Sequence, residues 1–104
     1  MITITRNLNV ITLYHYIFLI AAVIQSEESV GYCMALSTAS SVKRENRVTV
    51  PEFDSKETCL SGCKLIEGAK GCEYDTYGCN AIKVVVAMGD FTSGSICWRF
   101  IDKG

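Results

Sequence analysis

Residues 54–79 read DSKETCLSGCKLIEGAKGCEYDTYGC, and this stretch contains four of the six cysteines in the chain. Asp54 stands three positions before Glu57, the spacing of a capping box at the start of a helix. Gly68 follows at a distance suited to a helix stop. The stretch therefore predicts a helix over residues 55–66, with its cysteines on the side that packs against the rest of the protein.

The chain on both sides of this helix has the composition of short strands and turns. Val, Ile and Tyr alternate with polar residues, and Gly, Asp and Pro punctuate the runs. Strands are expected at residues 30–36, 47–50, 70–74, 79–86 and 96–101, with turns at 75–78 and 88–90 and a polar loop at 37–46. One helix packed on a small antiparallel sheet is an α+β domain.

The cysteine spacing limits how the thiols can pair. Cys59 and Cys63 are four apart, so on a helix they lie on one face with roughly parallel side chains, a poor geometry for bridging each other. Each must reach the sheet instead. Fifteen pairings are formally possible, and chain proximity favours Cys63 with Cys72 and Cys59 with Cys79, which leaves Cys33 for Cys97.

The first 26 residues have the pattern of a secretory signal peptide. Arg6 is their only charge, an apolar stretch follows over residues 10–24, and the chain then turns acidic at Glu27 and Glu28. A transmembrane anchor is the alternative, but a membrane span needs about 20 apolar residues and this run is shorter. We expect removal of residues 1–26, which leaves residues 27–104 as a single secreted, extracellular domain. Membrane contact is expected only if the peptide stays uncleaved.

Charge and histidine content exclude several functions. The only histidine, His15, lies in the expected signal peptide, so the secreted chain has no residue for Ser-His-Asp or Cys-His catalysis or for a histidine-containing zinc site. Without Arg6, nine basic residues face eleven acidic ones, which gives no electrostatic footprint for nucleic acid. We therefore expect neither enzymatic activity nor a cofactor.

The cysteine order resembles that of a known family. Cys59-x3-Cys63 on a helix, then Gly71-Cys72-x-Tyr74 and Cys79, is similar to the PAN/apple module. The closing segment, residues 97–100 (CWRF), resembles the last strand of short secreted PAN-like proteins of invertebrates. The resemblance covers residues 53–101, and a bridge from Cys33 to Cys97 would match the apple-type version. It implies a non-enzymatic module that binds proteins or carbohydrates, with no binding residues that carry over.

Four features allow a functional and a structural interpretation. Cys59, Cys63, Cys72 and Cys79 offer four thiolates for zinc, but secretion favours disulfides and the spacings differ from zinc knuckles. Glu73 and Asp75 share a strand face and suggest an acid pair or calcium ligands, yet alternating carboxylates more often lie on a solvated face. Trp98 and Phe100 suggest a sugar platform, whereas their spacing favours a core role. Lys43-Arg44 resembles a processing site, although such a pair is usually just solvated.

The sequence leaves two function classes open. The first is a secreted recognition module that binds an extracellular protein or glycan, for which Tyr77 and Phe91 are the expected exposed aromatic residues. The second is a small effector held by disulfides, such as a toxin, an inhibitor or a hormone-like peptide. Membrane-active peptides are usually cationic, and this chain is mildly acidic. An inhibitor would need a rigid exposed loop.

Overall fold

A computed structural model describes residues 24–101 of the 104-residue chain. These residues form one α-helix and antiparallel sheets, which confirms the expected α+β class. The elements in chain order are β1 (Ser26–Val30), β2 (Cys33–Ala35), β3 (Ser40–Ser41), the 3-10 helix η1 (Arg44–Asn46), β4 (Arg47–Thr49), α2 (Lys56–Cys63), β5 (Gly71–Asp75), β6 (Gly78–Ile82), β7 (Val86–Gly89) and β8 (Ile96–Phe100).

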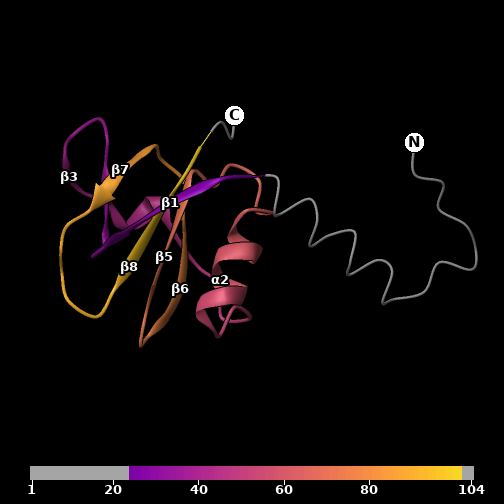
Figure 1. Cartoon of the computed structure of the whole chain (residues 1–104). Helices are drawn as coiled ribbons and strands as arrows, with labels where there is room; N and C mark the ends of the chain where they lie inside the picture. The colour runs from indigo at the N-terminus through magenta and orange to yellow at the C-terminus, as the bar shows by residue number, and fades with distance from the viewer. Residues whose placement is uncertain (1–23, 102–104) are drawn as a thin grey trace, which may run out of the picture.

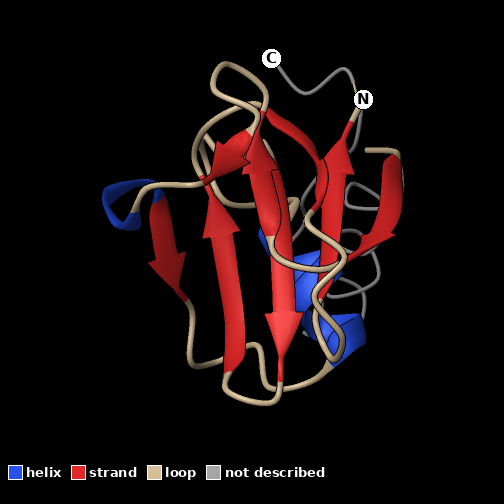
Figure 2. Ribbon diagram, turned by 90° about the vertical axis from the view of Figure 1, so that its left-hand side faces the viewer, coloured by secondary structure: helices blue, strands red, loops and turns tan. Residues whose placement is uncertain are grey.

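The elements are arranged in three layers. A five-stranded sheet in the order β1-β8-β5-β6-β4 is the middle layer, with α2 on one side and the three-stranded sheet β3-β2-β7 on the other (Figure 1). Figure 2 looks onto the strands, with α2 behind them. We expected a single sheet, and the second one corrects that expectation. Its presence means that both faces of the larger sheet are covered, at least in part.

The core beneath the helix joins cysteines to aromatic residues. Cys72, Ala81 and Trp98 lie opposite one another on neighbouring strands and pack against Cys59 and Cys63 of α2. Trp98 is 1% exposed and Phe100 is 7% exposed. Both aromatic residues thus belong to the core, as their spacing suggested.

A second core lies between the two sheets. Ile82 and Cys97 of the larger sheet pack there against Cys33, Ala35 and Val86 of the smaller one, with Val42 alongside. Burial of these side chains removes apolar surface from water, which is the main favourable contribution to holding the two sheets together.

The structure describes three disulfides and no free cysteine among residues 24–101. The pairs are Cys33–Cys97, Cys59–Cys79 and Cys63–Cys72, with Cα–Cα distances of 5.1, 5.6 and 6.1 Å. These are the pairs that the cysteine spacing favours. Two bridges attach α2 to the β5–β6 hairpin, and the third links β2 to β8 across the two sheets.

The expected first strand at residues 30–36 is wrong, because the chain changes sheets there. Residues Ser26–Val30 pair with β8, whereas Cys33–Ala35 pair with β3 and β7. Gly31 makes this crossing with φ of 109°, a conformation that suits glycine. A Cβ at this position would also overlap the backbone of Asp90 and Phe91.

The expected strand over residues 79–86 is also two strands. β6 ends at Ile82, and β7 begins at Val86 in the other sheet, so the expected turn at residues 88–90 begins within β7. Lys83 donates its backbone N–H to the carbonyl of Asn46 where the chain leaves the larger sheet. The alternation of apolar and polar residues continues from β6 into β7, because each of these strands buries one face. The sequence pattern therefore resembles that of a single strand.

Helix α2 is shorter than expected and has a different cap. Ser55, not Asp54, is the N-cap: its Oγ accepts from the N–H of Thr58 at 3.2 Å, and Thr58 Oγ1 accepts from the N–H of Ser55 at 3.1 Å. After Cys63 the chain continues with tighter turns, in which Ile66 N–H donates to the Cys63 carbonyl. The predicted capping box therefore exists one residue later, with Thr58 in place of Glu57.

The expected signal peptide lies mostly outside the described residues, which begin at residue 24. Ile24 packs against the helix-side core, Gln25 accepts a backbone hydrogen bond from Ile101 at 2.9 Å, and Ser26 pairs with Phe100. Cleavage after Ser26 would remove these three residues from the fold. These three residues are therefore part of the fold that the structure describes.

Candidate functional site

An open pocket of about 320 Å³ lies on the side of the five-stranded sheet opposite the helix. Each residue that lines it carries a polar group, although carbon atoms make up the larger part of the lining surface: Tyr32, Ser41, Arg47, Glu73, Asn80 and Asp90. They come from the strands β3, β4, β5 and β6 and from the residues next to β2 and β7. The pocket is thus assembled where the two sheets meet.

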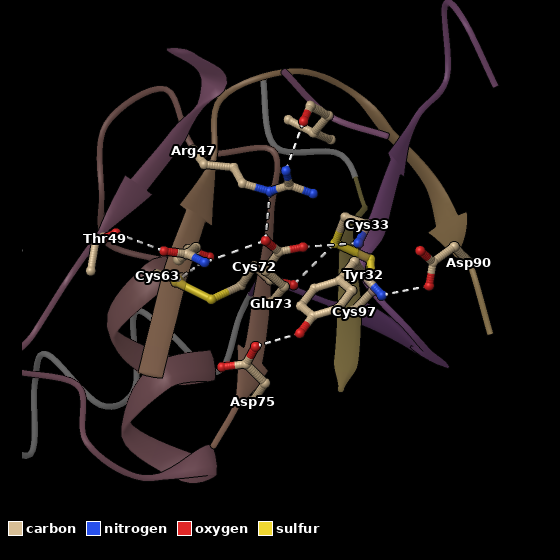
Figure 3. Close-up of polar contacts among 12 residues, drawn as sticks. Tyr32, Cys33, Arg47, Thr49, Cys63, Cys72, Glu73, Asp75, Asp90 and Cys97 are labelled. Carbon is tan, nitrogen blue, oxygen red and sulfur yellow. Dashed lines mark hydrogen bonds and ion pairs between the residues drawn. A yellow bond between two sulfur atoms is a disulfide. The ribbon is translucent and has the colours of Figure 1, made fainter. Parts of the chain in front are cut away.

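Glu73 is the best-connected residue of the pocket. Its Oε1 accepts from Arg47 Nε at 2.7 Å and from Asn80 Nδ2 at 3.4 Å, and its Oε2 accepts from the backbone N–H of Cys33 at 2.9 Å (Figure 3). Glu73 is only 2% exposed. The expectation that it lies on a solvated face is therefore wrong, because the second sheet covers that face.

Asp75 belongs to a separate set of hydrogen bonds. Its Oδ2 accepts from Tyr32 Oη at 2.7 Å, and its Oδ1 accepts from the N–H groups of Tyr77 and Gly78 in the β5–β6 turn. Glu73 and Asp75 thus bind different partners. The two carboxylates do not form an acid pair, and they do not form a set of calcium ligands.

Arg47 closes one side of the pocket. Its Nε binds Glu73, and its Nη1 donates to the carbonyl of Val42 at 2.8 Å. The side chain is 25% exposed, and a guanidinium has five N–H donors. Among the contacts of the described residues, Nη2 has no partner, so this nitrogen remains available as a donor.

Asp90 closes the other side. Its Oδ1 accepts from the N–H of Tyr32 at 2.9 Å and from the N–H of Thr92 at 3.0 Å. Hydrogen bonds from Thr92, from its side chain and then its backbone, lower the pKa of Asp90 below the ordinary value. Asp90 is therefore ionised at neutral pH. Donors from Tyr32, Thr92 and its own backbone use most of the about four hydrogen bonds that a carboxylate accepts.

Tyr32 lies between Asp75 and Asp90 and binds both: its phenol donates to Asp75, and its backbone N–H donates to Asp90 (Figure 3). The hydrogen bond from its phenol to Asp75 raises the pKa of Tyr32, with smaller contributions from burial and from the charges nearby. The phenol is thus neutral and its proton is committed to Asp75. The pocket therefore combines hydrogen-bond donors and acceptors in fixed positions with the aromatic ring of Tyr32.

A second, smaller pocket of about 230 Å³ shares Ser41 with the first. Its lining is mixed: it includes the hydroxyl-bearing Ser37, Thr38 and Ser40, the charged Lys43 and Glu45, and the apolar Ala35 and Val84. The two pockets thus adjoin along the small sheet.

The cysteines that suggested a zinc site are close together. The Sγ atoms of Cys59, Cys63, Cys72 and Cys79 all lie within 4.8 Å of one another and are buried. In the structure they are joined as two disulfides. Sulfur atoms in disulfides are not thiolates, and thiolates are what zinc binds.

The remaining candidates lie on the surface. Tyr77 is 94% exposed and Phe91 is 71% exposed, which agrees with their expected positions in or after turns. Phe91 has φ of 69°, and its N–H donates to the carbonyl of Val30 at 3.0 Å. Lys43 and Arg44 are both exposed where η1 begins.

Sequence reasoning did not find the pocket, because its residues come from segments far apart in the chain. One signal was present: polar residues occupy the same face of three adjacent strands. Thr49 pairs with Asn80, and Asn80 pairs with Glu73. A row of polar residues across a sheet indicates a polar site only when the strand order is known, and the sequence did not show that β4, β6 and β5 are neighbours.

No helix within residues 24–101 is long and apolar enough to cross a membrane. Comparison with protein-family models, with curated protein sequences and with solved structures found no match to this chain.

Proposed function

We propose that this chain is a secreted, non-enzymatic recognition module of the PAN/apple type, which binds an extracellular protein or carbohydrate. The observation that carries the proposal is the disulfide framework. Two nested bridges join one helix to the next hairpin, and a third bridge joins the first part of the domain to its last strand. This arrangement is the one that the PAN/apple resemblance implies.

Secretion is part of the proposal. Six buried cysteines joined as three disulfides are typical of small domains of oxidising compartments. The N-terminal apolar segment would direct the chain into the secretory pathway. The packing of Ile24 against the core supports a mature chain that still contains this residue. N-terminal sequencing of the protein released by a secretory host tests this step. An intact Met1 in a membrane fraction would contradict it.

The test of recognition is an array of glycans and extracellular proteins probed with the oxidised chain, residues 24–104. We expect selective binding that is lost after reduction and alkylation, because the bridges hold the binding surface in shape. The chain has no Asn-x-Ser/Thr sequon, so N-glycosylation does not interfere with the array. Equal binding by the alkylated chain would argue against a folded recognition site.

An inhibitor is the second candidate function, and the loop that follows β7 favours it. Phe91 is exposed at its start, while Gly31 N–H donates to Ser95 O at 2.8 Å and Ser95 Oγ donates to Thr92 O at 3.2 Å. A loop held in this way is rigid, and rigidity reduces the entropy lost on binding. Assays against a panel of extracellular proteases distinguish an inhibitor from a glycan-binding module.

A further inference from the structure

We propose that the pocket between the two sheets binds a neutral sugar, as the terminal unit of a glycan. The inference rests on the proposed recognition function and makes it specific, since it names the site and the chemistry of the ligand. It is carried by the lining of the pocket, by its charge and by the fixed positions of its polar groups.

The lining suits a ligand that combines hydroxyl groups with carbon surface. Pockets for drug-sized ligands measure about 300–1,000 Å³ and are mostly apolar. This one lies at the small end of that range, and each residue that lines it carries a polar group, although the exposed lining is somewhat more carbon than nitrogen and oxygen. An apolar ligand would leave these groups without water or a partner, at a cost in free energy. Sugar hydroxyls both donate and accept, so a small polyol matches the lining.

Donors and acceptors lie around the same pocket. Arg47 Nη2 and the second N–H of Asn80 supply donors, since only one amide hydrogen of Asn80 is needed for Glu73. Asp90 supplies a negative charge, with Oδ2 as the oxygen that the Tyr32 and Thr92 N–H groups do not bind, and the Ser41 hydroxyl serves as donor or acceptor. A pair of neighbouring hydroxyls can donate to a carboxylate and accept from an amide or guanidinium at the same time.

The charge of the lining disfavours anionic glycans. Glu73 already neutralises Arg47 at 2.7 Å, and Asp90 is left as the uncompensated charge of the pocket. A carboxylate or sulfate bound in this pocket would meet repulsion from Asp90, and Lys43 lines only the adjoining pocket. Neutral sugars avoid this repulsion.

The polar groups are held in place before a ligand arrives. Glu73 fixes Arg47, and the N–H groups of Tyr32 and Thr92 fix Asp90. Immobilising a free side chain on binding costs about 0.5–1.5 kcal/mol, and this cost is reduced here. The adjoining pocket of about 230 Å³, which shares Ser41, has room for a further unit of the glycan.

The test uses the oxidised chain, residues 24–104, on an array of glycans and on an array of extracellular proteins, followed by calorimetric titration of the best glycan. Asp90→Asn keeps an oxygen for the Tyr32 and Thr92 N–H groups but removes the charge, and Ser41→Ala removes one hydroxyl. Asp54→Asn is the matched control, because Asp54 is exposed and lies outside the pocket. Near-ultraviolet circular dichroism checks that each variant is folded.

We expect binding to glycans that end in a neutral sugar, with affinity lowered about 10-fold or more in Asp90→Asn and less in Ser41→Ala, and unchanged in Asp54→Asn. Glycan binding that neither pocket variant weakens would overturn the site, as would a preference for sulfated or acidic glycans. Binding to proteins alone would overturn the sugar and leave the recognition function standing. Binding to nothing on either array would contradict both proposals.

Discussion

Glu73 is the residue that connects the layers of this protein. Glutamate is rarely buried unless it is paired, and Glu73 is buried with a cation, an amide and a backbone N–H as partners. Those partners belong to β4, β6 and β2. One carboxylate therefore links three strands of the two sheets, which is a structural role in addition to its place in the pocket.

Replacing this carboxylate is expected to destabilise the fold. Glu73→Gln keeps the shape, but its one amide nitrogen replaces the acceptor of either Arg47 or the Cys33 N–H, and the charge that pairs with Arg47 is lost. Breaking a buried ion pair costs about 3–5 kcal/mol, and we expect about 3 because Arg47 is one-quarter exposed. Urea unfolding of the oxidised protein measures the loss. Glu52→Gln, at an exposed position, is the control, and equal stability of the two variants would contradict the role of Glu73.

Asp90 makes the corner after β7 sensitive to acid. Folding lowers its pKa, so the carboxylate contributes its full stabilisation above the ordinary pKa of 3.8 and loses it as the pH falls through the lower folded value. We expect the thermal stability of the wild type to exceed that of Asp90→Asn at pH 5 and to approach it as the pH falls below 3.8. A constant difference between the two proteins over this range would show that the charge of Asp90 is not involved.

At the scale of elements, helix α2 depends on its attachments. It has eight residues, and isolated helices of this length are unstable in water. Cys59 and Cys63 tie one face of the helix to the β5–β6 hairpin, and Phe53 and Leu60 pack against the same core. Tertiary contacts, more than helix propensity, therefore keep this segment helical.

Single substitutions at the start of α2 test which residue is its N-cap. Ser55→Ala removes the acceptor for the N–H of Thr58 and is expected to lower stability by about 1 kcal/mol. Asp54→Ala is expected to change it by less than about 0.5 kcal/mol, because its exposed side chain caps nothing. Thermal unfolding of both variants distinguishes them. A larger loss in Asp54→Ala would restore the cap that the sequence suggested.

At the scale of the whole molecule, covalent bridges supplement a small core. A domain of this size usually obtains only about 3–5 kcal/mol from its core. The Cys33–Cys97 bridge spans 64 residues, and loop-closure entropy assigns it about 4 kcal/mol. It also joins β2 of the small sheet to β8 of the large one, so it holds the two sheets together as well as the two ends of the domain.

Cutting the chain after the exposed pair Lys43-Arg44 tests this link. Cys33 is the only cysteine before the cut, so the two pieces should stay joined in denaturant and separate after reduction. Electrophoresis with and without reductant reads the outcome. A Cys33→Ala/Cys97→Ala variant is the control and should separate without reductant. Separation of the wild-type pieces without reductant would rule out the Cys33–Cys97 pair.

Local sequence determined the helix, the strands β4, β5 and β8, and the preferred cysteine pairs. The spacing of Cys59 and Cys63 put both on one helix face, and the spacing of Asp54 and Glu57 located the helix start to within one residue. Short strands bounded by Gly, Pro and Asp followed from composition. These features depend on residues only a few positions apart, and the physical preferences that govern them act over the same short range.

Only the tertiary structure decided which face each strand buries and against what. Alternation shows which residues share a face, but it does not show whether a second sheet covers that face. Glu73 and Asp75 therefore looked solvated, although Glu73 is buried, and the crossings at Gly31 and at residues 83–85 went unseen. The polar pocket arises from the same cause: strands distant in the chain become neighbours only when the sheets assemble.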